Sequence, residues 1–433
     1  MKIALINPPM PYLVVPDQQA PLGLLYLSAM IKRHRSDVGI EVLNLSGSFV
    51  EEAAGSIGEF DVYGYTATCT DYLNVVGMSR LVRARFPKAL QIIGGPHATL
   101  SNDEEMTRVF DSIFVGEAEH EILRFIDDFE MKRTRRFYFG EPGLDLDFLP
   151  FPDREALGKN QGGKVMVSQE GQSTVIMGSR GCPFNCAFCA SNALWTRNVR
   201  WRSVENLVEE IRHVINVHGV KTFRFSDDNM TSNKKRLLDF CDRVKDLGIR
   251  WRMSVRVDSL DDEVLKAVRE AGCADVNLGV ESFDPDVLVA MNKMVSPEDS
   301  IDAIQRVASH GINARLLMMI STPGETHWNT VKKNILCLEK LGDKFTIISL
   351  KTLVPFPGTD IWNDPKKYGV EIIDRNLRSF NYFMYEKGPD GKPVETPIHS
   401  NLRITGMTRE QQLDNIVQMR KYVASLPQNN EGK

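Results

Sequence analysis

The stretch that decides the fold is TVIMGSRGCPFNCAFCASN, Thr174–Asn192. Its first five residues form a short apolar run that predicts a buried strand. Three cysteines then follow within eight residues, at Cys182, Cys186 and Cys189. Four cysteines normally hold a four-iron, four-sulfur cluster, so three thiolates on one tight loop can bind three irons and leave the fourth open to another ligand. The sequence therefore predicts a 4Fe-4S site directly after a strand.

Two other interpretations of these cysteines are a structural zinc site and unliganded thiols. Zinc prefers four ligands in paired spacings, and the chain has no second CxxC and no CxxH. Three free thiols so close together would be prone to oxidation. The remaining cysteines are scattered, and we expect them to be small buried residues; they are Cys69, Cys241, Cys273 and Cys337.

Downstream of the cysteines, short apolar runs alternate with helical patterns. One helix is expected after Ser203, a good N-cap, with apolar residues repeating on one face. Six strand–helix units predict a partial (β/α)6 TIM-type barrel with its site at the carboxyl ends of the strands. The strand candidates are Thr174–Gly178, Thr222–Ser226, Trp251–Val255, Asp275–Gly279, Ala314–Ile320 and Phe345–Leu350.

Upstream, residues 1–130 alternate in the same way and predict an α/β domain with a doubly wound, Rossmann-like parallel sheet. Residues 131–172 are rich in proline, glycine and charge without periodicity, which is typical of a linker. Residues 173–352 form the expected barrel and 353–433 a region that closes it, ending in a helix over Thr408–Ala424. The upstream strand candidates are Lys2–Ile6, Ile40–Leu45, Asp61–Tyr65, Leu90–Ile93 and Ser112–Val115.

Composition excludes several classes of function. The 433 residues carry a net charge of −4 and no basic block, which argues against nucleic-acid binding. No apolar run reaches the roughly 18 residues needed to span a membrane. The first residues, MKIALINPP, lack the features of a signal peptide, so we expect a cytoplasmic protein.

The cysteine segment resembles the cluster loop of the radical S-adenosylmethionine superfamily. Further motifs follow in that family's order over roughly residues 170–360: WRSVENLVEEI, FSDDN, GVES, MNK and PGET. The resemblance implies that the open iron chelates the amino and carboxylate groups of S-adenosylmethionine. Electron transfer from the cluster, supplied by a reducing partner such as flavodoxin or ferredoxin, then yields a 5′-deoxyadenosyl radical.

The same resemblance implies roles for residues at the ends of successive strands. Phe188 is expected near the adenine, and Asp227 and Asp228 near the methionine end of S-adenosylmethionine. Arg256 is expected to pair with its carboxylate, and Glu281 to accept hydrogen bonds from the ribose. An alternative for Asp227 is a helix cap, and Arg256 and Glu281 could instead form a structural ion pair.

Residues Met318–Thr322, followed by PGET, are expected to flank the adenine. Met318 and Ser321 are therefore candidate cofactor contacts. The family more usually has glycine and leucine before PGE, whereas this chain has Ser321 and Thr322.

The first domain resembles the cobalamin-binding domain found ahead of such barrels, through NPP, PLGLLYLSA, DVYGYTATCT, GGPHAT and GEAE. Small residues at strand ends would let a flat macrocycle approach the backbone. No Asp-x-His sequence supplies a cobalt ligand, and His97 is interpreted as a loop residue near the nucleotide tail. The alternative is a domain that serves only as a lid or scaffold. The candidate contacts are Thr66, Thr70, Gly94, Gly95, His97, Gly116 and Glu117.

These observations together favour an enzyme that uses two molecules of S-adenosylmethionine and cobalamin to methylate an unactivated carbon of a small-molecule biosynthetic intermediate. The alternative is a radical dehydratase, epimerase or ring-rearranging enzyme acting on a sugar or natural-product scaffold. A third class, a noncatalytic cobalamin or redox sensor, would not need the adenosyl-binding motifs. Aromatic residues after the barrel suit either a substrate pocket or a core; they are Trp362, Phe380, Tyr382, Phe383 and Tyr385.

Overall fold

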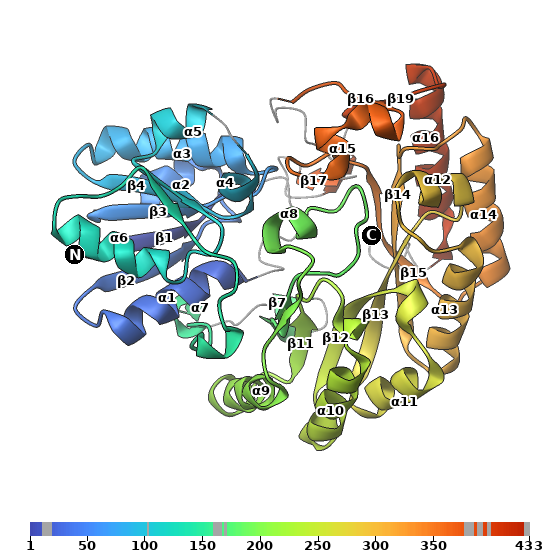
Figure 1. The fold of residues 1–433 in the computed structure, drawn as a ribbon, viewed down its shortest axis with the longest axis horizontal. Helices are drawn as coiled ribbons and strands as arrows, with labels where there is room; N and C mark the ends of the chain where they lie inside the picture. Colours follow the sequence, from blue (N-terminus) through green and yellow to red (C-terminus); the bar gives the residue numbers. More distant parts are fainter. Residues whose placement is uncertain are drawn as a thin grey trace. The chain divides into compact units, whose positions relative to one another are not determined.

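A computed structural model describes residues 1–10, 20–101, 104–158, 167–168, 171–375, 385–387, 393–395 and 400–427 (Figure 1). The chain divides into two compact units. The N-terminal unit comprises residues 1–175, 213–220 and 385–394, and the barrel unit comprises residues 176–212, 221–384 and 395–433. None of the described helices is long and apolar enough to cross a membrane.

The N-terminal unit is built on a parallel six-stranded sheet with the order β2-β1-β3-β4-β5-β6. Strand order reverses beside β1, the kind of position where ligands bind in doubly wound sheets. The first five strands match the sequence prediction to within two residues, whereas β6 lies in the predicted linker. The strands are β1 (Lys2–Asn7), β2 (Gly39–Asn44), β3 (Val62–Thr66), β4 (Leu90–Gly94), β5 (Ser112–Val115) and β6 (Phe137–Phe139).

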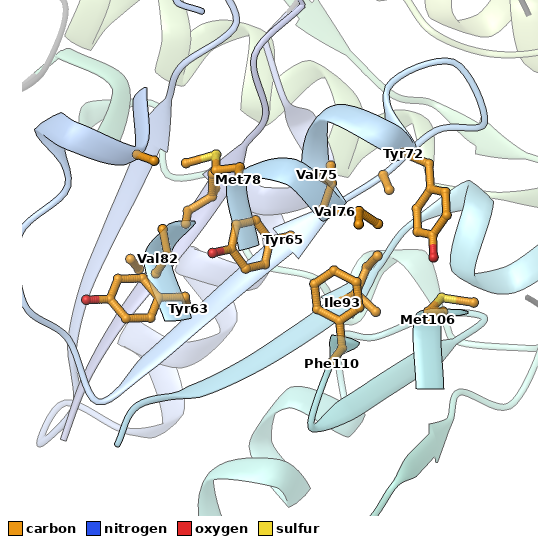
Figure 2. Close-up of a cluster of buried hydrophobic side chains, with 14 of the residues drawn as sticks. Tyr63, Tyr65, Tyr72, Val75, Val76, Met78, Val82, Ile93, Met106 and Phe110 are labelled. Carbon is orange, nitrogen blue, oxygen red and sulfur yellow. The ribbon is translucent and has the colours of Figure 1, made fainter. Parts of the chain in front are cut away.

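Helices cover both faces of this sheet. In β1, Ile3 and Leu5 pack into one core with α1 and α6, while Ala4 and Ile6 pack into the other with α2, α3 and α5. Figure 2 shows the second core around Tyr65. A strand that buries both faces is expected to be apolar throughout, as β1 is. Because helices cover both faces of the parallel sheet, the predicted doubly wound fold is confirmed. The helices are α1 (Leu22–His34), α2 (Val50–Ser56), α3 (Tyr72–Arg85), α4 (Pro96–Leu100), α5 (Glu104–Val109), α6 (Glu121–Glu130) and α7 (Glu155–Gly158).

A second sheet has the order β15-β14-β13-β12-β11-β8-β7. Strands β11 to β15 pair in parallel, and helices lie along the outside of the curved sheet (Figure 1). The predicted partial barrel is confirmed, with an additional short strand, β7, antiparallel to β8. The strands are β7 (Val167–Ser168), β8 (Gly171–Ile176), β11 (Thr222–Phe225), β12 (Arg250–Arg256), β13 (Cys273–Glu281), β14 (Asn313–Ile320) and β15 (Thr346–Thr352).

The barrel helices alternate with these strands along the chain, and short helices and strands lie in the connecting segments. The helices are α8 (Ser191–Trp195), α9 (Val204–His218), α10 (Lys234–Val244), α11 (Asp262–Glu270), α12 (Pro285–Ala290), α13 (Pro297–Ser309), α14 (Asn329–Leu341), α15 (Asp360–Asn363) and α16 (Arg409–Ser425). The short strands are β9 (Ser179–Arg180), β10 (Arg200–Trp201), β16 (Val370–Ile372), β17 (Tyr385–Lys387), β18 (Pro393–Glu395) and β19 (Leu402–Ile404).

The C-terminal region packs back onto the barrel unit. Ile361, Val370 and Leu402 share a buried cluster with Ala187 of the cysteine loop and Met291. Helix α16 begins with a capping box in which Thr408 and Gln411 bond to each other's backbone. Among the aromatic candidates, Trp362 is partly exposed beneath Arg375. Phe380, Tyr382, Phe383 and the side chain of Tyr385 lie outside the described residues.

Candidate functional site

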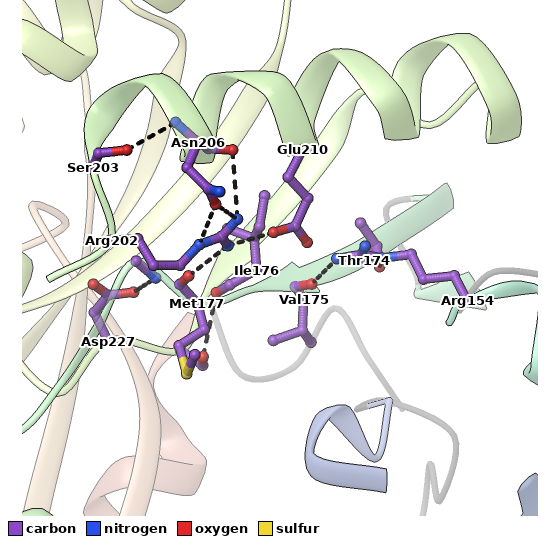
Figure 3. A network of polar contacts seen from close by, with 12 residues as sticks. Arg154, Thr174, Val175, Ile176, Met177, Arg202, Ser203, Asn206, Glu210 and Asp227 are labelled. Carbon is purple, nitrogen blue, oxygen red and sulfur yellow. Dashed lines mark hydrogen bonds and ion pairs between the residues drawn. The ribbon is translucent and has the colours of Figure 1, made fainter. Parts of the chain in front are cut away.

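The strand that leads into the cysteine loop is held at its carboxyl end by Arg202, which precedes helix α9 and is bound by two residues of that helix (Figure 3). The guanidinium of Arg202 donates to the carbonyl of Met177 at 2.9 Å and forms an ion pair with Glu210. Both charged side chains are buried, and the Asn206 amide oxygen accepts from Arg202 Nε at 2.9 Å. Breaking a buried pair on one side leaves an uncompensated charge, so this contact fixes the strand end firmly.

Asp227 holds the next two residues of the chain. Its carboxylate accepts from the backbone N–H of Gly178 at 2.8 Å and from the Ser179 hydroxyl at 2.6 Å. Burial raises the pKa of Asp227, although these donors oppose that shift. The carboxylate therefore supports the start of the cysteine loop and caps no described helix.

The cysteine loop is closed at its base and held along its length. Strands β9 and β10 pair antiparallel at its two ends. Gly181 has φ +104°, and a Cβ there would lie 3.1 Å from the Asn198 carbonyl oxygen, so the turn requires glycine. The N–H of Ala187 donates to the carbonyl of Met291 at 2.9 Å, and Ile361 N–H donates to the carbonyl of Ala187 at 3.1 Å.

The three predicted cluster cysteines lie on this loop and are partly exposed, whereas Cys69, Cys241 and Cys273 are buried, as expected. Cys337 was expected to be buried as well, and that prediction is wrong, because it is partly exposed on α14. Burial raises the pKa of Cys189 to about 12, and the charges of Asp228, Cys186 and Cys182 add to this effect.

The donor chemistry of the loop fits a cluster. Among the described residues, no three His, Cys, Asp or Glu side chains converge on a position for a single metal ion. The support for a cluster is therefore the set of three thiols and their spacing on one anchored loop. Thiolates are the ligands that iron–sulfur clusters use, and metal binding deprotonates a coordinating thiol even where its free pKa is high.

Asp228 lies beside this loop. It accepts from the Ser191 hydroxyl at 2.7 Å, and burial raises its pKa. Its negative charge also raises the pKa of Cys182 and of Cys189, after burial. The carboxylate of Asp228 therefore makes the electrostatic potential more negative on this side of the loop.

Arg256 and Glu281 do not pair with each other. Arg256 forms a salt bridge with Asp258 at 3.0 Å, whereas Glu281 pairs with Lys293 at 2.9 Å. The proposed alternative of an Arg256–Glu281 pair is therefore wrong. Glu281 has φ +63° at a register shift between β13 and β14, a strained conformation of the kind found at functional sites. Lys293 belongs to the MNK motif but was not among the predicted site residues.

A cavity of about 290 Å³ opens at the carboxyl ends of β13, β14 and β15. It contains three of the predicted cofactor residues, Phe188, Glu281 and Met318. Sequence reasoning missed Lys351, although a lysine at the end of an apolar strand was a usable signal. Burial lowers the pKa of Lys351. The other lining residues are Leu317, Met319, Ser349, Thr352, Val354 and Phe356.

Ser321 does not line this cavity. It is buried with φ +60°, and its hydroxyl lies 2.6 Å from that of Ser400, so it links the end of β14 to the C-terminal region. Beside it, Glu325 accepts from the backbone N–H of Thr322 at 2.9 Å. The predicted residues Asp227, Asp228 and Arg256 also lie outside the lining of the cavity, near the cysteine loop.

In the N-terminal unit, the three predicted loops meet at the carboxyl ends of the strands. Thr66 and Gly94 are partners across β3 and β4, and the N–H of Gly116 donates to the Thr99 hydroxyl at 3.0 Å. A Cβ at Gly95, which has φ +93°, would lie 2.6 Å from the Thr66 hydroxyl oxygen. Thr70 continues the first loop, with its hydroxyl 2.8 Å from that of Thr68. Small residues therefore allow these loops to lie close to one another.

His97 departs from its predicted place. It lies in helix α4 rather than in a loop, because Pro96 begins a helix directly after the tight turn at Gly95. Its side chain is fully buried and stacks on Tyr72 with 3.8 Å between ring centroids. A cobalt ligand or a contact to a nucleotide tail would require His97 to leave this core.

Glu117 lines a separate cavity of about 450 Å³ in the N-terminal unit. Its neighbours there include Glu119, Glu121, Glu141 and Asp145, together with Arg124, which pairs with Glu121, so the lining is mostly acidic. An acidic lining suits a neutral or cationic part of a ligand and disfavours phosphate groups.

Comparison with known proteins gives a family and several relatives. The profile of the Radical SAM superfamily matches residues 176–332. An uncharacterized methyltransferase of Pyrococcus horikoshii is 31% identical over 84% of this chain and 82% of its own length. The anaerobic magnesium-protoporphyrin IX monomethyl ester cyclase of Cereibacter sphaeroides is 28% identical over 68% of this chain and 51% of its own.

A similar fold occurs in a solved structure, the radical S-adenosylmethionine methyltransferase TsrM from Kitasatospora setae with cobalamin and a [4Fe-4S] cluster bound. The TM-score is 0.68 at 14% identity, and the match covers 97% of this chain and 90% of TsrM. The likeness extends over both units of the chain.

Proposed function

The chain belongs to the Radical SAM superfamily, and on that basis we propose that it is a cobalamin-dependent enzyme that methylates a carbon of a small-molecule intermediate. Membership implies a 4Fe-4S cluster and S-adenosylmethionine as cofactors. The observation that carries the proposal is the thiol loop, anchored by Arg202 and Asp227, in the same unit as a cavity that contains Phe188 and Glu281.

In this proposal Cys182, Cys186 and Cys189 hold three irons of the cluster. When bound, the cluster supplies the electron that cleaves S-adenosylmethionine, and cobalamin carries the methyl group. Phe188 offers an apolar surface for the adenine, and Glu281 offers carboxylate oxygens to the ribose hydroxyls. The apolar residues Met318 and Met319 exclude water from the cavity, which protects a radical from side reactions.

The N-terminal unit is proposed to bind cobalamin at the carboxyl ends of its strands, over the loops at Thr66, Gly94 and Gly116. Support comes from the parallel sheet, the closely packed small residues there and the TsrM structure, which has cobalamin bound. We propose that no histidine of the chain binds cobalt, because the sequence lacks Asp-x-His and His97 is buried.

A second candidate reaction is ring formation or rearrangement without methyl transfer. The similarity to an anaerobic cyclase favours it, although this chain spans about half of that protein. The similarity to a methyltransferase is higher and covers most of both chains, so methylation is the preferred proposal. In either case we propose that a small low-potential electron carrier, such as flavodoxin or ferredoxin, supplies the electrons.

The two reactions are separated by their coproducts. Protein reconstituted anaerobically with iron, sulfide and hydroxocobalamin would be incubated with S-adenosylmethionine, a chemical reductant and candidate substrates. Methylation that consumes two molecules of S-adenosylmethionine yields both 5′-deoxyadenosine and S-adenosylhomocysteine. Formation of 5′-deoxyadenosine alone would support the second candidate, and formation of neither by cluster-loaded protein would refute both.

A further inference from the structure

Arg256 is the last residue of strand β12, and four of the five N–H groups of its guanidinium donate hydrogen bonds to neighbouring residues. Its Nε and Nη2 donate to the two carboxylate oxygens of Asp258, each at 3.0 Å, and Nη2 also donates to the carbonyl of Lys293 at 2.8 Å. Nη1 donates to the sulfur of Cys186 at 3.6 Å. The ring of Phe184 lies 3.8 Å from the guanidinium carbon. Only one N–H of the five is left without a bond among these contacts.

These contacts fix the guanidinium in position. The bidentate bond to Asp258 sets the plane of the fork, and Phe184 covers one face of it. The segment that supplies the Lys293 carbonyl is itself bound to the cysteine loop, since the Asn292 amide donates to the carbonyl of Asn185 at 2.6 Å. The fork therefore cannot turn to another partner without breaking several bonds.

The three cysteines consequently lie in different electrostatic surroundings. Cys182 and Cys189 are near the carboxylate of Asp228, and the charge of Arg256 also acts on Cys182. Cys186 differs from both because its sulfur accepts a hydrogen bond from Arg256. Lys293 is a second cation near Cys186. Burial lowers the pKa of Lys293, and the charges of Glu281 and Cys186 more than offset this, so the pKa is raised.

We infer that Arg256 is a positioning residue of the cluster, whose hydrogen bond to the sulfur of Cys186 makes the cluster easier to reduce. The inference rests on the proposed role of the three cysteines. Reduction takes one electron from an external donor, and no bond is made or broken and no proton is needed. Because the added electron increases the negative charge on the ligand sulfurs, a cationic donor beside one sulfur stabilises the reduced form.

This role differs from the one expected from the sequence, in which Arg256 binds the carboxylate of S-adenosylmethionine. The difference is measurable, since a contact to Cys186 acts with or without S-adenosylmethionine. A carboxylate contact would act only in its presence.

The first test uses the unaltered protein, loaded with its cluster and labelled with ¹⁵N in the arginine guanidinium groups. Pulsed paramagnetic resonance of the reduced cluster without S-adenosylmethionine should show coupling to a ¹⁵N nucleus. The coupling should disappear in Arg256→Lys. A cluster without this coupling, or a coupling that appears only after S-adenosylmethionine is added, would overturn the inference. Failure of the unaltered protein to bind a cluster would instead refute the proposed function.

The second test is a potentiometric titration of Arg256→Gln followed by paramagnetic resonance. Loss of the charged donor should shift the reduction equilibrium at least tenfold toward the oxidised cluster. For a one-electron couple this corresponds to a reduction potential that is at least 59 mV lower. The control is Arg315→Gln, which removes the same charge near the amino end of β14 and should leave the potential unchanged. An unshifted potential in cluster-loaded Arg256→Gln would overturn the inference; if that variant binds no iron, the ¹⁵N result decides.

Discussion

Replacement of Glu325 by glutamine should change how the stability of the barrel unit depends on pH. Glu325 belongs to the PGET turn after β14 and is only 3% exposed. One of its oxygens accepts from the backbone N–H of Thr322 at 2.9 Å and from its hydroxyl at 3.0 Å. Burial raises the pKa of Glu325 from 4.5 to about 7, and the hydrogen bonds from Thr322 only partly oppose this.

The sign follows from proton binding. Between pH 4.5 and about 7 the folded protein holds a proton on Glu325 that the unfolded chain releases, so the folded state is favoured by acid. The contribution is fully present below pH 4.5 and is lost as the pH rises through about 7. A shift of this size corresponds to about 3 kcal/mol. Glutamine keeps an acceptor for Thr322 and cannot ionise.

The assay is the melting temperature of reconstituted protein between pH 4.5 and 8. For a unit of this size, about 3 kcal/mol corresponds to roughly 6–12 °C. The Glu325→Gln variant should gain that much relative to the unaltered protein as the pH rises across the range. Glu339→Gln, on the exposed face of α14, is the control and should show no such gain. Melting curves of Glu325→Gln and unaltered protein that stay parallel across pH would refute the reasoning.

Three further predictions test the site and its support. Cys186→Ala should lose iron and sulfide whereas Cys241→Ala should retain both, by elemental analysis; full loading of Cys186→Ala would contradict the cluster assignment. Glu281→Gln should keep the cluster but weaken S-adenosylmethionine binding about tenfold to a hundredfold in anaerobic calorimetry, since a charged hydrogen-bond partner contributes about 1.5–3 kcal/mol; unchanged affinity would limit Glu281 to its pair with Lys293. Thr408→Ala should destabilise α16 by about 1 kcal/mol through loss of the capping box, seen as faster hydrogen exchange in its first turn.

Most elements of the fold were predictable because they carry a local signal. Apolar runs and their spacing located five strands of the first sheet and six of the second, and Thr408 marked the start of α16. The loop at Cys182–Cys189 could be located because its three thiols are close in sequence. The predicted linker was less accurate, since β6 and β7 are two or three residues long and leave almost no periodicity to detect.

The partners of charged side chains were not predictable in the same way. Arg256 and Glu281 stand at neighbouring strand ends, which suggested a pair, yet the local turn brings Asp258 to Arg256 and a later segment brings Lys293 to Glu281. Such choices depend on loop conformation and on side-chain rotamers, which spacing does not report. For His97 a signal was present, because proline is over-represented at the first position of helices and Pro96 directly precedes it.

The hydrogen bonds that hold the cysteine loop come from residues that are synthesised much later, which affects when the loop can reach its final structure. Asn185 is bound by Asp360, 175 residues later in the chain, and by Asn292, 107 residues later. At about 5–20 residues per second, a ribosome needs on the order of 10–35 seconds to make the more distant partner after Asn185. During that interval the bond from Asp360 cannot form, and the thiols of the nascent chain are exposed to oxidants. We therefore expect iron and sulfide to be inserted late in maturation, and truncated chains that end before Asp360 should accumulate oxidised, iron-free cysteines.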